Sequence, residues 1–243
     1  MRSLREAVDD VLSIQTGSGK PLSVILAGHN GSGKSTLWYR QLASRFQIPL
    51  INADRMMMSI LPEILPGRKL PSWASTLRDG DTSWMQVAQK GVEALVAQAM
   101  ARKVAFAMET VFSHWRPVED GSVESKIDLI RQMQAAGYFV VLIFVGLTSA
   151  QLSIGRVSTR KQQGGHAVAI DRLIDRFPRT QRAIEQARSV ADAAILLDNS
   201  RTEDEAFTVC RVQLGDTGSF DLRRGQAPVP PAIRQWLDVV SPL

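Results

Sequence analysis

The stretch Gly28-His29-Asn30-Gly31-Ser32-Gly33-Lys34-Ser35-Thr36 decides the fold of this chain. It follows the apolar run 22–27, which predicts a buried strand, and precedes residues 35–45, which predict a helix. The spacing Gly-x-x-x-x-Gly-Lys-Ser in this context is that of a phosphate-binding loop. Its glycines let backbone amides turn inward, and the helix amino terminus adds a partial positive charge for phosphate. The alternative, a glycine-rich turn without a nucleotide, does not account for the lysine and the hydroxyl.

Each loop residue has an expected part in holding ATP and Mg²⁺, the cofactors that the motif predicts. Lys34 reaches the β- and γ-phosphates, and the Ser35 hydroxyl is the expected metal ligand. The remaining nucleotide-binding candidates in the loop are Gly28, Asn30, Gly31, Ser32, Gly33 and Thr36. A second glycine run, Gly17-Ser18-Gly19-Lys20, lacks both the first glycine and the Ser/Thr of the motif, so we interpret it as a linker.

Outward from the loop, short apolar runs alternate with helical stretches, which is typical of an α/β fold with a mostly parallel sheet of five or six strands and helices on both faces. The predicted strands are 22–27, 48–52, 104–108, 139–145, 194–197 and an edge strand at 207–212. The predicted helices are 35–45, 84–101, 123–136, 150–157, 179–190 and 232–240. Two segments interrupt the alternation: 55–83, with three prolines, and 156–179, which is rich in Lys and Arg. We expect three parts: a short helix or linker at 1–20, the loop-containing domain at 21–215, and a tail with a short helix at 216–243.

Composition narrows the functional classes. The chain has 243 residues with a net charge of +5, and its hydrophobic content of 44% excludes wholesale disorder. A single cysteine, Cys210, excludes an internal disulfide, and with only three histidines a zinc site is not expected. The charged start and the lack of an apolar run of about 20 residues predict a soluble, cytoplasmic protein without a membrane segment. The small charge excess and an aromatic content of 6% argue against nucleic acid as a partner.

Asp54 is the candidate catalytic base. It follows the second predicted strand, about twenty residues after Lys34, where an acidic group can accept a proton from a substrate hydroxyl near the γ-phosphate. The alternative is a helix N-cap. The third strand ends in Glu109-Thr110, without the apolar run and Asp of a motor protein or GTPase, and no Asn-Lys-x-Asp guanine signature occurs. These features favour a small-molecule kinase.

A further set of motifs occurs in a fixed order along the chain: Asn52-Ala53-Asp54, Glu109-Thr110, 142–147, 153–157, Gly164-Gly165-His166-Ala167-Val168 and Asp198-Asn199-Ser200. With the phosphate loop, these residues resemble the zeta toxin family of phosphate-loop kinases, in particular its solitary chromosomal branch, over roughly residues 20–200. The resemblance implies a fold similar to nucleoside monophosphate kinases. It also implies ATP-dependent phosphorylation of a nucleotide sugar such as UDP-N-acetylglucosamine, and a small helical antitoxin as partner.

The resemblance also implies roles for individual residues. Asp54 would be the base, and Glu109 and Thr110 would position the substrate. Arg156, Arg160 and Arg176 would face the phosphates. Arg156 and Arg160 are four residues apart and so share a helix face; a solvated basic surface is the alternative. For His166, a substrate contact and a loop-ordering hydrogen bond are equally open.

Three positions depart from the family pattern: Ala169 replaces a proline, Asp175 precedes Arg176, and Phe177 stands where tyrosine is common. The departures bear on the identity of the substrate more than on phosphoryl transfer. Two other functions stay open, a polynucleotide or nucleotide hydroxyl kinase and a regulatory ATP-binding module.

Overall fold

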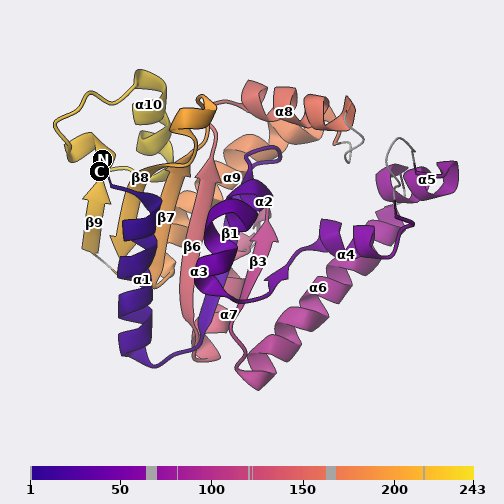
Figure 1. Ribbon diagram of the computed structural model, residues 1–243, viewed down its shortest axis with the longest axis horizontal. Coiled ribbons are helices and arrows are strands. Elements are labelled where there is room, and N and C mark those ends of the chain that lie inside the picture. Colours follow the sequence, from indigo (N-terminus) through magenta and orange to yellow (C-terminus); the bar gives the residue numbers. More distant parts are fainter. Residues whose placement is uncertain are drawn as a thin grey trace.

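A seven-stranded sheet with strand order β2-β3-β1-β6-β7-β8-β9 forms the centre of the molecule (Figure 1). We analysed a computed structural model, which describes residues 2–63, 70–80, 82–119, 121, 123–162, 168–215 and 217–243. The first five strands in this order are parallel, and β8 and β9 are antiparallel to their neighbours. The carboxyl ends of β1, β3 and β6 therefore meet at one edge, where α/β proteins place their ligand sites.

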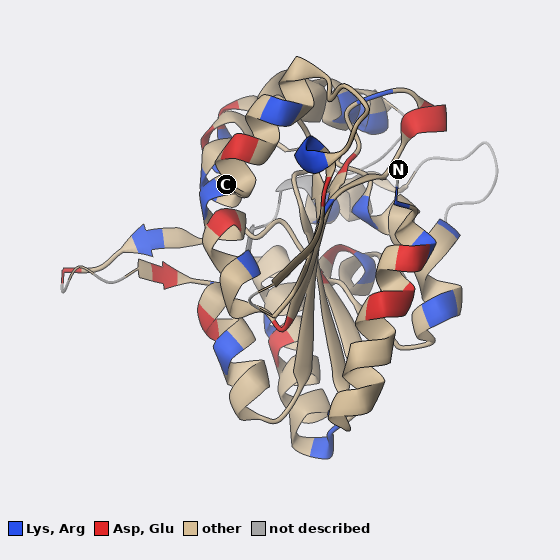
Figure 2. Cartoon of the chain, turned by 90° about the vertical axis from the view of Figure 1, so that its left-hand side faces the viewer, with Lys and Arg blue, Asp and Glu red and all other residues tan. Residues whose placement is uncertain are grey.

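The strands form where apolar side chains are buried on both faces of the sheet. β1 and β6 are buried at every position. Such runs are typical of parallel sheets covered on both sides. The strands of the main sheet are β1 (Leu22–Gly28), β2 (Leu50–Ile51), β3 (Phe106–Thr110), β6 (Phe139–Gly146), β7 (Ala193–Asp198), β8 (Thr208–Leu214) and β9 (Thr217–Asp221). A separate ribbon of β4 (Trp115–Pro117) and β5 (Val123–Ser125) projects from the body (Figure 2).

Two helical layers enclose the sheet and bury two separate apolar clusters (Figures 1 and 2). One face is covered by α1 (Leu4–Ser18) and by a continuous helical stretch made of α2 (Lys34–Leu37), the π-helical turn η1 (Trp38–Leu42) and α3 (Ala43–Phe46). The other face is covered by α6 (Thr82–Arg102), α7 (Ile127–Ala135), α9 (Ile170–Val190) and α10 (Pro231–Val240). The remaining helices are α4 (Ala53–Ser59), α5 (Ser72–Gly80), α8 (Ala150–Gln162) and two short 3₁₀ turns, Glu203–Glu205 and Leu222–Arg224.

The structure confirms the parallel sheet and all six predicted strands, but it corrects several boundaries. The predicted helix 123–136 is wrong in its first turn, because Val123–Ser125 pairs with Trp115–Pro117. The sequence pattern did not predict the seventh strand of the main sheet, β9. Segment 55–83 is not irregular throughout, since α4 and α5 occupy much of its described part.

Two further interpretations change near the ends of helices. The glycine run at 17–20 is the end of α1, where Gly19 has a left-handed φ of 67° and caps the helix. The basic segment 156–179 is helical in its described part, as the end of α8 and the start of α9. Residues 163–167, which include the predicted Gly164-Gly165 pair and His166, lie outside the described residues.

Candidate active site

The phosphate loop leaves β1 at Gly28 and enters α2 at Lys34. Gly31 and Gly33 have φ angles of 72° and 93°, left-handed values that glycine adopts without strain. At Gly28 the limit is space, because a Cβ there would lie 2.5 Å from the carbonyl oxygen of Val145 and 2.6 Å from Ser32 Oγ. The loop shape therefore depends on the glycines of the motif.

Two side chains from distant elements hold the loop from outside. Ser153 Oγ on α8 donates to the carbonyl oxygen of Asn30 at 2.7 Å, and Asn199 Nδ2, after β7, donates to that of Ser32 at 2.8 Å. Both residues lie in motifs of the family resemblance, but their spacing in the sequence gave no indication of this role. They fix loop carbonyls on the outside of the turn, which favours amides that point inward.

Lys34 is buried and folds back on its own loop. Its Nζ donates to the carbonyl oxygens of Gly28 at 2.9 Å and His29 at 3.0 Å, and lies 3.9 Å from Glu109 Oε1. Burial lowers the pKa of Lys34, while the carboxylates of Glu109 and Asp54 act in the opposite direction. The ammonium is thus surrounded by acceptors in a position from which phosphate oxygens can recruit it.

Glu109, at the carboxyl end of β3, contacts the loop directly. Ser35 Oγ donates to its two carboxylate oxygens at 2.9 and 3.2 Å, and Asn52 Nδ2 donates to Oε2 at 2.7 Å. A hydroxyl and a carboxylate at this distance form the kind of hard-oxygen pair that suits Mg²⁺. Among the described residues no group of three or more His, Cys, Asp or Glu could hold a metal ion, but Mg²⁺ beside a nucleotide needs only one or two protein oxygens. The residues present therefore fit the ion that the motif predicts.

Asp54 lies in the first turn of α4 with its side chain exposed. The N-cap of this helix is Asn52, whose Oδ1 accepts from the backbone N–H of Arg55 at 3.1 Å. The alternative interpretation of Asp54 as an N-cap is therefore wrong. Its carboxylate is close enough to Lys34 to favour the charged lysine, so the structure brings the predicted base and the phosphate-binding lysine together.

The three predicted arginines lie on the two helices that flank the loop. Arg156 is on α8, and its Cβ is 3.0 Å from where a Cβ on Gly31 would lie, so α8 packs directly on the loop. Arg160, one turn later, is near enough to lower the pKa of Lys34. Arg176 lies on α9, beside Phe177, which stacks on His29 of the loop with ring centroids 4.1 Å apart. The predicted site residues of the described part therefore gather around one edge of the sheet.

His29 has no counterpart among the predicted roles. Burial, and secondarily the charge of Lys34, lower its pKa to about 3, so the ring is neutral at physiological pH. Its Nε2 is buried and has no hydrogen-bond partner among the described residues. The residue acts through ring packing between Phe177 and Phe144, which joins the loop to α9 and β6.

Thr110 and an unpredicted lysine complete this edge of the sheet. The Thr110 hydroxyl accepts from the backbone N–H of Phe112 at 3.2 Å and from Nζ of Lys126 at 2.5 Å. Lys126 immediately precedes α7. A single lysine before an amphipathic helix carries no signal in the sequence, and only the fold reveals its position.

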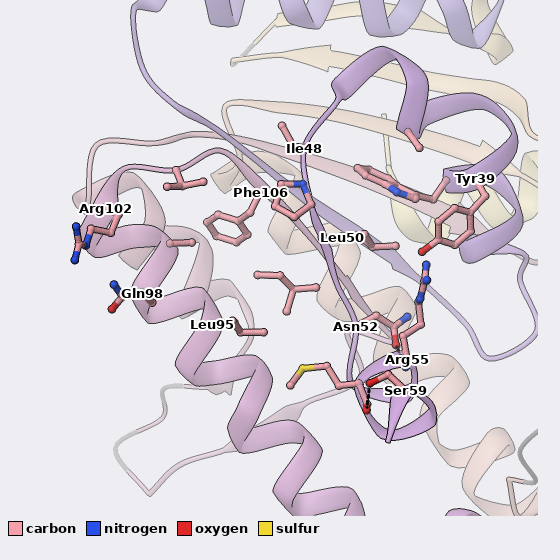
Figure 3. A pocket seen from close by; sticks show the side chains of 17 residues that line it. Tyr39, Ile48, Leu50, Asn52, Arg55, Ser59, Leu95, Gln98, Arg102 and Phe106 are labelled. Carbon is pink, nitrogen blue, oxygen red and sulfur yellow. Dashed lines mark hydrogen bonds between the residues drawn. The ribbon is translucent and has the colours of Figure 1, made fainter. Parts of the chain in front are cut away.

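A separate apolar groove lies behind α4 (Figure 3). It has a volume of about 730 Å³ and runs between α6 and η1, over the edge strand β2. Its labelled lining includes Tyr39, Leu50, Leu95 and Phe106, with Arg55 and Arg102 at opposite ends. Asp54, Lys34 and the predicted arginines do not line it, so the groove is distinct from the phosphate loop.

Comparison with known proteins identifies a family and a fold. The family model described as Zeta toxin matches residues 5–206. A protein of Haemophilus influenzae that bears no functional name is 26% identical over 150 residues, covering 61% of this chain and 87% of that protein.

No helix in the described ranges is long and apolar enough to cross a membrane.

Two solved structures share the fold at low identity. A structure from the PezAT chromosomal toxin–antitoxin system of Streptococcus pneumoniae aligns with a TM-score of 0.54 and 14% identity over 98% of this chain and 88% of that one. The AvrRxo1-ORF1:-ORF2 structure with ATP aligns with a TM-score of 0.59 and 14% identity, over 97% of this chain and 69% of that one.

Proposed function

The chain belongs to the zeta toxin family, and on that premise we propose that it transfers the γ-phosphate of ATP to a hydroxyl of a nucleotide sugar such as UDP-N-acetylglucosamine. Membership makes it an ATP-dependent phosphotransferase, and the proposal concerns the acceptor and the residues that act on it. The observation that carries it is the convergence of Lys34, Ser35, Glu109 and Asp54 at the carboxyl ends of β1, β2 and β3.

In the proposed mechanism Lys34 leaves its loop carbonyls for the β- and γ-phosphates, and the amides of residues 28–36 surround the phosphate chain. Asp54 accepts the proton of the acceptor hydroxyl. The oxygen of that hydroxyl attacks the γ-phosphorus, while the bond from the γ-phosphorus to the β-phosphate oxygen breaks. Arg156 and Arg160 on α8 stabilise the charge that spreads over the transferred group.

Mg²⁺ would be held by Ser35, with Glu109 beside it, and would neutralise charge on the β- and γ-phosphates. The hydrogen bond between the two side chains supports this assignment for Glu109, in addition to the substrate contact that the resemblance implies. Asn52 keeps the carboxylate turned toward Ser35.

We further propose a cytoplasmic setting and a small protein antitoxin as partner. The free, buried Cys210 suits a reducing compartment, which is also where nucleotide sugars and ATP occur together. The PezAT structure comes from a toxin–antitoxin system, and AvrRxo1-ORF1 is in complex with ORF2, which supports an inhibitory partner for this chain.

The test is incubation with ATP, Mg²⁺ and a panel of nucleotide sugars, nucleotides and oligonucleotides, followed by mass spectrometry for one added phosphate. We expect the phosphate on a UDP-sugar, and none with Lys34→Ala. An oligonucleotide as preferred acceptor would replace the proposal by an end kinase. ATP binding without transfer to any acceptor would favour a regulatory module.

A further inference from the structure

The end of β3 presents hydrogen-bond donors on the face opposite Glu109. Because side chains alternate along a strand, Glu109 faces α2 while Thr110 faces α7 and α9. Thr110 Oγ1 accepts from Phe112 N–H and from Lys126 Nζ, so its own proton is left to donate. In the part of the chain that the structure describes, that hydroxyl donates no hydrogen bond.

Lys126 is a partly buried cation that forms no ion pair with the described residues. No carboxylate of the described residues comes within ion-pair distance of its ammonium, which has the hydroxyl of Thr110 as its hydrogen-bond partner. Burial lowers the pKa of Lys126; Glu93 opposes this from a distance, and Arg176 adds to it. Partial loss of hydration is unfavourable for this ammonium unless an anion compensates its charge.

Arg176 brings a second cation to the same place, with the charge of Asp175 acting in its favour. Thr180 Oγ1 on α9 donates to the carbonyl oxygen of Val111 at 3.3 Å, which anchors α9 beside the end of β3. Arg176 is four residues earlier and so lies on the same face of α9. Among the described residues it forms no ion pair, and the neighbouring Arg172 and Arg179 add further positive charge.

This cluster adjoins the phosphate loop without belonging to it. Phe177, next to Arg176, stacks on His29 of the loop, and Glu109, next to Thr110, accepts from Ser35. The donors therefore lie beside the γ-phosphate position, on the side away from Ser35.

We propose that Lys126, Thr110 and Arg176 form an anion subsite that binds a phosphate or diphosphate group of the acceptor, with Lys126 as a positioning residue. Two cations and a hydroxyl whose proton is left to donate fit a multiply charged oxyanion. The inference rests on the proposed kinase function and specifies which part of the acceptor this chain recognises. It explains why the fold tolerates an uncompensated lysine at this position.

The test uses inorganic pyrophosphate as the probe, titrated by calorimetry into protein saturated with Mg²⁺ and a non-hydrolysable ATP analogue, so that the phosphate loop is already filled. We expect Lys126→Met to weaken pyrophosphate binding about 10- to 100-fold, as for loss of a charged hydrogen bond. Lys126→Arg keeps the charge and should stay within a few-fold of wild type. Lys90→Met is the matched control, because Lys90 is exposed on α6, and it should bind as wild type does.

Thermal unfolding of the ligand-free protein separates this role from a structural one. Removing a partly buried charge that has no ion-pair partner should leave the Tm of Lys126→Met unchanged or raised, whereas a lysine needed for the fold would lower it. If Lys126→Met does not fold, Arg176→Met replaces it in the pyrophosphate titration, and normal pyrophosphate binding by Arg176→Met overturns the inference. Wild-type protein that does not bind pyrophosphate, or a Lys126→Met variant that binds it normally, also overturns the inference.

Turnover distinguishes this inference from the proposed function. With UDP-N-acetylglucosamine as acceptor, Lys126→Met should raise the acceptor KM more than it lowers kcat, while the KM for ATP stays unchanged. If that sugar is not phosphorylated but pyrophosphate binding depends on Lys126, the proposed acceptor is wrong and the anion subsite stands.

Discussion

At Glu109, polar side chains from three parts of the chain meet within hydrogen-bond distance. Ser35 comes from α2, Asn52 precedes α4, and Glu109 ends β3. Their separation in the sequence conceals the contact, since residues 35 and 109 are brought together only by the parallel pairing of β1 with β3. The Glu109 carboxylate therefore has two candidate roles: it lies beside the metal ion, or it contacts the substrate.

Glu109→Gln distinguishes these tasks. The amide keeps the shape but loses the charge, so we expect a kcat lowered by about 10²-fold or more together with a higher Mg²⁺ requirement. Measuring kcat over a range of Mg²⁺ concentrations checks this. An unchanged Mg²⁺ requirement with a raised acceptor KM would instead assign Glu109 to the substrate.

Asp54→Asn should remove turnover and spare ATP binding. The amide cannot accept the proton of the acceptor hydroxyl, and loss of a positioned base costs about 10²–10⁴-fold in rate. Single-turnover kinetics and calorimetry with an ATP analogue measure the two effects separately. Joint loss of Mg²⁺-ATP binding and turnover would make Asp54 a metal-site residue and leave the base unassigned.

His29 makes the fold sensitive to acid. Its pKa is about 3 in the folded protein and near 6.5 when unfolded, so between these values the unfolded chain binds the extra proton. Stability is therefore lost as the pH falls below 6.5, and His29 accounts for about 2–3 kcal/mol of loss at pH 4.5. Urea unfolding at pH 7 and pH 4.5 should show a smaller difference for His29→Gln than for wild type. Equal differences would mean that His29 is not protonated selectively in the unfolded state.

At the scale of elements, α8 carries the interactions that place charge over the loop. Ser153 donates a hydrogen bond to the carbonyl oxygen of Asn30. Arg156, three residues later on α8, packs its Cβ against Gly31. The helical spacing predicted that Arg156 and Arg160 share a face, and the structure turns that face to the loop. The sequence alone left a solvated basic surface equally open, because nothing in the spacing says which neighbour a helix face meets.

Arg156→Ala should slow phosphoryl transfer more than it weakens ATP binding. If the guanidinium acts mainly on charge in the transition state, kcat falls by about 10²–10³-fold while the Kd for ATP changes a few-fold. Arg131→Ala on α7 is the control, since Arg131 is exposed and pairs only with Asp128 among the described residues. Similar kinetics for the two variants would reduce Arg156 to an ordinary surface charge.

At the scale of the whole molecule, apolar runs predicted the sheet because its central strands β1 and β6 are buried at every position. Apolar runs do not predict β9, because this strand is partly exposed and has little apolar content. Its sequence is Thr217-Gly218-Ser219-Phe220-Asp221. Nor do they predict the β4–β5 ribbon, whose exposed residues need no apolar pattern. The phosphate loop was predictable because local spacing encodes it, and the proposal of Asp54 as the base rests on its spacing from Lys34. The position of Lys126 was not predictable, because its hydrogen-bond partner, Thr110, lies on β3.

The carboxyl-terminal residues 216–243 were expected as a tail, and we propose that their described part, 217–243, stabilises the main domain. β9 pairs with β8, and α10 buries Trp236 against Phe144 and the backbone of Gly146 at the end of β6. A Cβ at Gly146 would clash with the Trp236 indole, so the tryptophan fits only because that position is glycine.

Trp236→Ala should therefore lower the free energy of unfolding by about 3–5 kcal/mol, the usual cost of truncating a buried tryptophan. Val239→Ala, on the exposed side of the same helix, should change it by less than about 0.5 kcal/mol. Urea unfolding followed by circular dichroism measures both variants in one transition, because α10 and the sheet share one apolar cluster. If Trp236→Ala were as stable as Val239→Ala, residues 217–243 would be an appendage, and the packing of α10 over the end of β6 would not contribute to the stability of the site beneath it.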